Sequence, residues 1–239
     1  MNLVIDSGNT ALKAAIFEKD QLKELLHNIS LEGLKAIAEK YPFKKAVISS
    51  VNESASVISE KINMMNILII DKHTSLPFKN LYKTPETLGT DRIAAVAGAK
   101  TFYPQAPCLA IDAGTCITFD FIDADNNYHG GSISPGINLR FKALHNFTAR
   151  LPLVNRKERT ELIGGNTEES MQSGVMKGII AEVDGMIDSY RSRYPELQVI
   201  ICGGDTPFFE TNLKQSIFVV PDLVLIGLNR ILEYNAAEF

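Results

Sequence analysis

The hydrophobic pattern opens with short apolar runs of strand length, separated by polar turns. They cover residues 3–5, 12–17 and 22–29, and the polar stretch 18–21 separates the last two. Apolar runs joined by short polar turns are typical of strands that follow one another in a sheet. The opening of the chain therefore predicts an antiparallel meander of three strands.

After the meander, the pattern alternates between helical and strand periods. Ser30 can cap a helix in which Leu34 and Ile37 recur at helical spacing and which Pro42 ends. Residues 71–86 contain two prolines and little periodicity, which predicts a loop. The predicted elements of this part are helices over 31–40, 54–64 and 88–102 and strands over 46–51 and 67–70.

The second half of the chain repeats the opening. NLVIDSGNT at 2–10 and CLAIDAGTC at 108–116 align at one constant offset, and each leads an apolar strand into Asp-x-Gly. Such internal similarity indicates an ancient duplication. The further predicted elements are strands over 109–112, 117–122, 128–134, 199–202 and 217–220, a basic loop over 150–159, a helix after 136, a long helix over 167–194, a helix after 204 and a last helix from about 221.

Length, composition and charge narrow the class of protein. A chain of 239 residues leaves one large domain and two small ones open, and 45% apolar with 22% charged residues is ordinary for a globular core. The net charge of −4, with no block of lysine or arginine, argues against a broad nucleic-acid or membrane surface but allows local anion sites. No apolar run approaches a membrane span, so we expect a cytoplasmic protein.

Cysteine and histidine give no sign of a metal centre. Cys108, Cys116 and Cys202 are odd in number, lack CxxC spacing and stand in apolar strands. This favours reduced core cysteines over disulfides or metal ligands. The four histidines show no ligand spacing either, so zinc is not expected.

The paired Asp-x-Gly turns are the main chemical candidates. A single such turn is common, because Asp tolerates left-handed geometry and Gly allows positive φ, so DSGNT alone fits a plain turn and a phosphate site equally well. Lys13 and the matched DAGT at 112–115 favour phosphate. Turn amides can cradle phosphate oxygens, Lys13 can neutralise them, and Asp6 can hold Mg²⁺ through water.

Taken together, the motifs resemble those of type III pantothenate kinases. DSGNTALK at 6–13, GTDR at 89–92, DAGT at 112–115, GGSISPG at 130–136 and NTEES at 166–170 occur in that family's order, over nearly the whole chain. The family is part of the actin-like, sugar-kinase superfamily. The resemblance therefore implies an α/β fold of two tandem ribonuclease-H-like domains, over 1–106 and 107–239, each a mixed sheet with helices on both faces.

The resemblance also implies an activity. It is the transfer of the γ-phosphoryl group of ATP to pantothenate, giving 4′-phosphopantothenate in the first step of coenzyme A biosynthesis. Asp91 matches the family's proton acceptor and Arg92 suits the carboxylate of pantothenate, although read alone both could be first-turn and surface charges. The implied ATP-binding residues are Asp6, Ser7, Gly8, Asn9, Thr10, Ala11, Leu12, Lys13 and Thr115. The implied substrate-binding residues are Tyr82, Gly89, Thr90, Asp91, Arg92 and Thr167.

Several of these positions keep a second interpretation. Asp112 resembles the family's ligand for K⁺ or NH₄⁺, but the residues alone do not separate it from a second magnesium carboxylate. Tyr82 alone reads as a packing aromatic, Thr115 as the start of a strand, and Thr167 with Asn166 as a helix cap. In the family the threonine comes from a neighbouring subunit, so the resemblance implies a homodimer with the active site at its interface.

A function of another class is also compatible with the repeat. A non-catalytic, actin-like nucleotide-binding regulatory module would use ATP only as a conformational ligand. Such a module has no use for a proton acceptor beside a substrate pocket, so Asp91 together with Lys13 favours the kinase. Gly203 and Gly204 stand where actin-like ATPases carry an adenosine-binding turn, and a plain strand-to-helix turn fits them as well.

Overall fold

The structure is a computed structural model that describes residues 1–8, 12–50 and 54–236. Its contacts divide the chain into two compact units. The first unit comprises Met1–Gln105, Ile122–Gly130 and Asp222–Phe239, and the second comprises Ala106–Phe121 and Gly131–Pro221. The chain therefore returns to the first unit twice after leaving it, once in a hairpin and once in its last helix.

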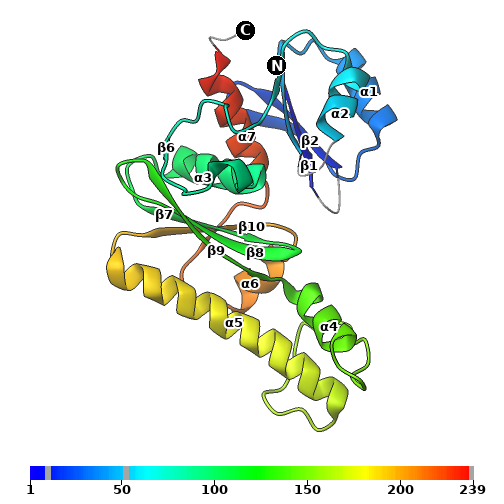
Figure 1. Cartoon of the computed structure of the whole chain (residues 1–239), viewed down its shortest axis with the longest axis vertical. Coiled ribbons are helices and arrows are strands. Elements are labelled where there is room, and N and C mark those ends of the chain that lie inside the picture. Colours follow the sequence, from blue (N-terminus) through cyan, green and yellow to red (C-terminus); the bar gives the residue numbers. More distant parts are fainter. Residues whose placement is uncertain (9–11, 51–53, 237–239) are drawn as a thin grey trace. The chain divides into compact units, whose positions relative to one another are not determined.

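The first unit contains a five-stranded sheet in the order β3-β2-β1-β4-β5. Its strands β1 and β2 are labelled in Figure 1. β1 pairs antiparallel with β2, and β2 pairs antiparallel with β3, which confirms the predicted meander. β4 and β5 continue the sheet in parallel on the other side of β1. The strands are β1 Asn2–Ser7, β2 Leu12–Glu18, β3 Gln21–Leu26, β4 Lys45–Ser50 and β5 Ile67–Ile69.

Helices cover both faces of this sheet. α1 (Leu31–Lys40) and α2 (Ser54–Ile62) lie on the face where Leu3 and Ile5 form a buried cluster with apolar residues of both helices. Ser30 caps α1 as predicted, because its hydroxyl accepts a hydrogen bond from the Gly33 amide at 3.1 Å. Side chains alternate along a strand, so Asn2 points to the opposite face, where its side chain donates to Asn229 of α7 at 2.9 Å.

The opposite face carries α3 (Thr90–Phe102) and α7 (Leu223–Tyr234), and the two helices pack against each other through glycines. A methyl group added at Gly227 would overlap the carbonyl of Ala94, and one added at Gly98 would overlap the carbonyl of Leu223. Because glycine has no side chain, the two backbones can approach this closely. α7 also contacts β1 and β4, so it joins the sheet to α3.

The second sheet repeats the strand order of the first. Its order β11-β10-β7-β8-β9-β6 contains β9-β8-β7-β10-β11, the counterpart of β3-β2-β1-β4-β5. β7 and β1 share the same burial pattern along six residues, as the duplication predicts. The strands are β6 Lys79–Asn80, β7 Cys108–Ala113, β8 Cys116–Ile122, β9 Asn127–Pro135, β10 Gln198–Cys202 and β11 Phe218–Val219.

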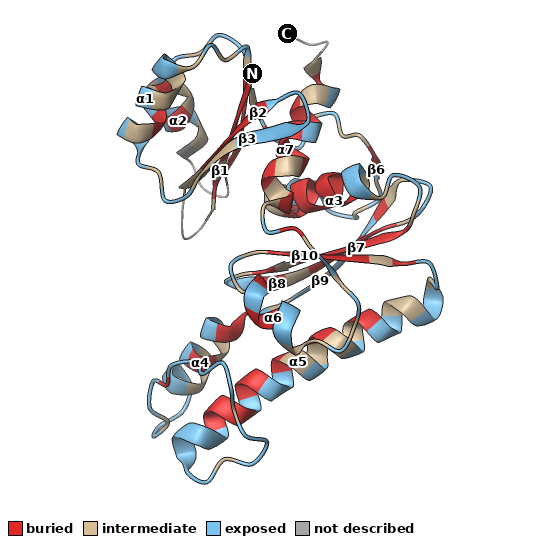
Figure 2. Ribbon diagram, turned by 180° about the vertical axis from the view of Figure 1, so that it is seen from behind, coloured by how far each residue is buried: buried red, intermediate tan, exposed pale blue. Residues whose placement is uncertain are grey.

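One face of β7, β8 and β10 is covered by α4 (Ile137–Asn146), α5 (Thr167–Arg193) and α6 (Thr206–Asn212). The apolar stripe of α5 is buried at Val175, Ile179, Val183 and Ile187. Figure 2 shows that exposed residues alternate with buried ones along the length of α5. This long helix therefore uses only one side for the core of the second unit.

Some boundaries differ from the sequence prediction. α3 begins at Thr90 rather than residue 88, because a short 3-10 turn, η1 (Pro85–Thr87), precedes it and Gly89 is its N-cap. The loop over 71–86 contains β6, which pairs with β9. No helix in the described part of the chain is long and apolar enough to cross a membrane.

None of the three cysteines is bridged to another, and only two belong to the core. Cys108 and Cys202 are buried, whereas Cys116 is exposed. The core interpretation is wrong for Cys116 because it follows the β7–β8 turn directly, and its neighbour Thr115 is exposed as well.

The close packing of α3 and α7 predicts the effect of Gly227→Ala. Alanine favours a helix over glycine by about 1 kcal/mol, but overpacking a tight contact costs roughly 1–3 kcal/mol, so the variant should be less stable than the wild type. Gly185→Ala is the matched control, because no atom lies within 4 Å of the added carbon on α5. Urea unfolding should show a loss for Gly227→Ala and none for Gly185→Ala; equal stability of the two variants would contradict the packing.

Candidate active site

The candidate site of the first unit is built on Asp6, near the end of β1. Asp6 lies directly opposite Lys13 in the antiparallel pair with β2, and opposite Ser49 in the parallel pair with β4. The fully buried Ser49 hydrogen-bonds the Asp6 carboxylate. The central strand therefore presents one carboxylate between a cation and a hydroxyl, at the edge where β1 and β4 both end.

The start of α3 meets the same edge. The hydroxyls of Ser49 and Thr90 are 2.9 Å apart, which joins β4 to the first residue of the helix. Asp91 follows, and its Oδ1 accepts a hydrogen bond from the amide of Arg92 at 2.8 Å. A side chain at Gly89 would overlap this Oδ1, so the Asp91 carboxylate can take this position only because residue 89 is glycine.

The pKa of Asp6 is raised above its ordinary value. The main cause is burial, which removes water from the charged form, and the nearby Asp91 raises the pKa further. Lys13 and the hydrogen bond from Ser49 oppose the shift. Two carboxylates in a partly buried site repel each other, and a cation between or beside them would relieve that repulsion.

These residues fit a hydrated divalent ion rather than a closed metal cage. Among the described residues, no three His, Cys, Asp or Glu side chains lie close enough to hold a metal. Mg²⁺ keeps several waters and takes one or two carboxylates together with substrate phosphates. Asp6 therefore suits magnesium held through water, with its remaining ligands supplied from outside the protein.

Arg92 is not a surface charge. Only 6% of it is exposed, so the surface-charge interpretation is wrong for Arg92, whereas Asp91 does lie in the first turn of α3. Its guanidinium carbon lies 5.5 Å from the centre of the Tyr82 ring, and Tyr82 stacks on Tyr128 with ring centres 6.2 Å apart. An aromatic stack beside a buried guanidinium lowers the local polarity, which strengthens any pairing of that cation with an anion.

The equivalent turn of the second unit lies after β7. Asp112 pairs with Cys202 of β10, and a side chain at Gly203 would overlap both the Asp112 carboxylate and the carbonyl of Ala113. The amide of Gly136 donates to the carbonyl of Thr115 at 3.0 Å, which joins the end of β9 to the turn. The turn thus gathers a carboxylate and backbone carbonyls, the oxygen donors that hard cations prefer.

The turn after β10 is fixed to this cluster. The amide of Asp205 donates to the carbonyl of Ala113 at 2.9 Å, and the hydroxyl of Thr206 donates to the carbonyl of Gly203 at 2.6 Å. Gly203 has φ of +93°, and a carbon added at Gly204 would meet no atom within 4 Å. The contacts describe an ordered strand-to-helix turn, and an adenosine-binding role for it stays a prediction.

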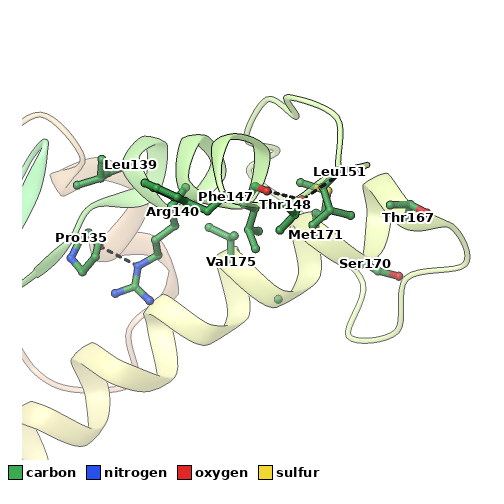
Figure 3. A pocket seen from close by; sticks show the side chains of 13 residues that line it. Pro135, Leu139, Arg140, Phe147, Thr148, Leu151, Thr167, Ser170, Met171 and Val175 are labelled. Atoms are coloured by element: carbon green, nitrogen blue, oxygen red, sulfur yellow. Dashed lines mark hydrogen bonds between the residues drawn. The ribbon is translucent and has the colours of Figure 1, made fainter.

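Thr167 lies at the start of α5, away from these turns. Asn166, rather than Thr167, caps the helix, because its side chain accepts a hydrogen bond from the amide of Glu169 at 3.0 Å. Thr167 lines a groove of about 920 Å³ between α4 and α5, at the end opposite Pro135 and Arg140 (Figure 3). The Thr167 hydroxyl is therefore not needed for the cap.

The first unit brings five of the predicted site residues together. Asp6, Lys13, Thr90, Asp91 and Arg92 gather around the ends of β1 and β4 and the start of α3. Ser7 is buried at the end of β1, and Leu12 packs partly against the core below it. Asp112 and Thr115 form the separate turn of the second unit. Asn9, Thr10 and Ala11 lie outside the described residues.

Two contributors were not found from the sequence. The position of Ser49 is predictable from the sequence, because Ser49 and Ser50 end the apolar strand that continues the sheet beside β1. Parallel strands end at the same edge of a sheet, which brings Ser49 close to Asp6. Tyr128 had no local signal, because its stacking on Tyr82 joins segments far apart in the chain.

Comparison with known proteins decides the family. A model of type III pantothenate kinases matches residues 2–189. The chain belongs to the type III pantothenate kinase family. A type III pantothenate kinase of Bacteroides fragilis is 48% identical over 98% of both chains, and one of Christiangramia forsetii is 45% identical over 100% of both.

Solved structures agree in fold with this member of the type III pantothenate kinase family. A Campylobacter jejuni protein, proposed to be a Baf family transcriptional activator, gives a TM-score of 0.64 at 23% identity over 98% of this chain and 99% of that one. A glucokinase from an Antarctic psychrotroph gives 0.52 at 12% identity over 98% of both chains. These likenesses confirm the α/β fold with two ribonuclease-H-like domains.

The raised pKa of Asp6 predicts how Asp6→Asn changes stability with pH. Below the pKa that Asp6 has in the unfolded chain, Asp6 is protonated in the folded and the unfolded protein, and its ionisation does not affect the free energy of unfolding. As the pH rises above that pKa, Asp6 ionises in the unfolded chain before it ionises in the folded protein. The unfolded state is then favoured, and the wild type loses stability. Asp6→Asn should therefore gain over the wild type between acidic and neutral pH, measured as the difference in melting temperature.

A control of opposite sign tests this origin. Hydrogen bonding from the His73 amide lowers the pKa of Asp71, so Asp71 adds stability above its unfolded-state pKa and loses it as pH falls. Asp71→Asn should be less stable than the wild type at neutral pH, and the difference should vanish in acid. If Asp6→Asn shows the same sign as Asp71→Asn, burial does not dominate at Asp6.

Proposed function

We propose that this chain phosphorylates pantothenate with ATP, giving 4′-phosphopantothenate and ADP, the first step of coenzyme A biosynthesis. The carrying observation is the cluster in the first unit, where Asp6, Ser49, Thr90 and Asp91 meet beside the buried Arg92. In a chain of this family, such a cluster supplies a phosphate side and a carboxylate-binding side around one proton acceptor. The reaction is placed in the cytoplasm, because ATP is its phosphoryl donor.

The phosphate side is the turn after β1. Residues 6–13, with Thr115 from the second unit, are the proposed ATP contacts, and Lys13 offsets phosphate charge. Asp6 would hold Mg²⁺ through water, and the bound ion would neutralise charge that develops on the phosphate oxygens. The burial of Asp6 favours cation binding, because the attraction between a carboxylate and a cation is stronger where less water surrounds them.

Asp91 is the proposed general base. It accepts the proton of the pantothenate hydroxyl as that oxygen attacks the γ-phosphorus, and the bond from phosphorus to the bridging oxygen of ADP breaks. Asp91 lies in the first turn of α3, directly after Thr90. The bond from the Arg92 amide fixes the orientation of Asp91.

The substrate side is the proposed task of Arg92, with Tyr82, Gly89 and Thr90. A guanidinium can pair with the pantothenate carboxylate through two parallel hydrogen bonds, and it keeps its charge when buried. Fixing the carboxylate at one end places the hydroxyl at the other end near Asp91. Most of the rate enhancement then comes from positioning and charge rather than from covalent chemistry.

Asp112 is the proposed ligand of a monovalent cation, K⁺ or NH₄⁺. Its carboxylate and the carbonyls of the β7–β8 turn supply oxygen donors, and the absence of a side chain at Gly203 keeps the space beside the carboxylate open. The bound cation would offset negative charge on the phosphates of the nucleotide.

A homodimer is proposed from Thr167 and the groove beside it. The groove between α4 and α5 is lined mostly by apolar residues, and Phe147 at its rim is 87% exposed. Exposed apolar side chains that line a groove can be covered by a protein partner. A second copy of this chain covering the groove would let Thr167 reach the neighbouring substrate site, as the family resemblance implies.

A coupled assay for ADP tests the reaction. Purified protein should consume ATP only when pantothenate is present, and turnover should rise when K⁺ or NH₄⁺ replaces a bulky organic cation. Equal ATP consumption without pantothenate would overturn the assignment. Calorimetry that shows ATP binding without pantothenate binding would favour the regulatory module instead.

Asp91→Asn should lower kcat by roughly two to four powers of ten, the usual contribution of a general base, because the amide cannot take the proton. ATP affinity should change little, since Asp91 is not proposed to contact the nucleotide. Glu86→Gln is the control, because Glu86 is an exposed carboxylate in η1 just before the motif. A kcat of Asp91→Asn within twofold of the wild type would remove Asp91 from the mechanism.

A further inference from the structure

Gly130 is the first residue of GGSISPG, and the proposed reaction gives that segment no task. Its backbone has φ of +92°, a left-handed conformation that side chains rarely adopt. A carbon added to Gly130 would stand 2.7 Å from Cδ2 and 2.9 Å from Cε2 of Tyr82. The Tyr82 ring therefore lies on the bare backbone of Gly130, in the space where any other residue would place its side chain.

Tyr82 is held by other contacts as well. The Asn80 side chain accepts a hydrogen bond from the Tyr82 amide at 2.9 Å, which fixes the turn after β6. The fully buried Tyr128 stacks on the ring with an angle of 23° between the planes. Arg92 lies on the same ring, with its guanidinium carbon 5.5 Å from the ring centre. Gly130 and Tyr128, both on β9, thus support a ring that in turn supports Arg92.

We infer that Gly130 is a positioning residue for substrate binding, acting through Tyr82 on the Arg92 guanidinium. This inference rests on the proposed function, in which Arg92 holds the carboxylate of the acceptor substrate. A planar guanidinium binds a carboxylate through two parallel bonds only when its plane is fixed, and the Tyr82 ring sets that plane. The Tyr82 ring can occupy this position only because Gly130 has no side chain.

A side chain at this position would displace the ring and with it the guanidinium. Among the described residues, the Tyr82 ring is what a carbon added at Gly130 would meet within 4 Å. The loss should therefore appear in recognition of the acceptor rather than in use of ATP. A cation on an aromatic face contributes about 0.5–2 kcal/mol, which corresponds to roughly a threefold to thirtyfold weaker interaction when it is lost.

The test is a double-mutant cycle of Gly130→Ala and Tyr82→Ala, with KM measured for both substrates. Gly130→Ala should raise KM for pantothenate roughly threefold to thirtyfold and change KM for ATP by less than about twofold. In the Tyr82→Ala background the same change should add less than about twofold, because residues that act through one another are not additive. Equal effects of Gly130→Ala in both backgrounds would overturn the inference.

Two further variants separate positioning from backbone strain. Asn126 is another left-handed position of the same hairpin, with φ of 62°. Asn126→Ala places alanine in a left-handed conformation away from Tyr82, so it should leave KM for pantothenate unchanged even if the melting temperature falls. Asn80→Ala loosens Tyr82 without touching Gly130, so it should raise KM for pantothenate in the same direction even if Gly130→Ala fails to fold. An unchanged KM in Asn80→Ala would contradict the inference.

The outcome also distinguishes this inference from the proposed function. Wild-type protein that does not phosphorylate pantothenate at all would overturn both. Wild-type activity with an unchanged KM in Gly130→Ala would overturn only the role of Gly130.

Discussion

The first unit is organised around one unfavourable interaction, the partial burial of the Asp6 carboxylate at the end of its central strand. Burial raises the pKa of this group, so the folded chain carries a charge that it solvates poorly. The sheet register brings Lys13 and Ser49 to either side, and the start of α3 adds Thr90 and Asp91. This arrangement lowers the free energy of unfolding of the protein alone. It also forms a site whose charges a cation and an anionic substrate would stabilise.

Much of this arrangement can be predicted from the sequence because it depends on local patterns. The meander, the capped helix α1 and the repeated strand into Asp-x-Gly all arise from contacts between neighbours in the chain. Lys13 faces Asp6 because the antiparallel register of β1 and β2 fixes which residues lie opposite each other. GTDR was informative because it stands where a helix begins, although the exact start depended on the 3-10 turn before it.

Other features depend on contacts that no local pattern records. Tyr128 and Gly130 meet Tyr82 only because β6 pairs with β9, a pairing of two residues in each strand between distant segments. The burial of Arg92 depends on the same stack, so its charge alone suggested a surface position. The division of the chain at residue 106 stays a prediction about domains.

The place of α7 has a consequence for how the protein is made. The first unit has its strands and α3 early in the chain, yet the helix that covers β1 and β4 and packs against α3 follows the entire second unit. During synthesis the ribosome releases the second unit while the first still has one apolar face without its helix. The nascent chain therefore passes through a stage with exposed hydrophobic surface, the condition under which chaperones bind. The first unit therefore becomes complete only after the second unit has been synthesised.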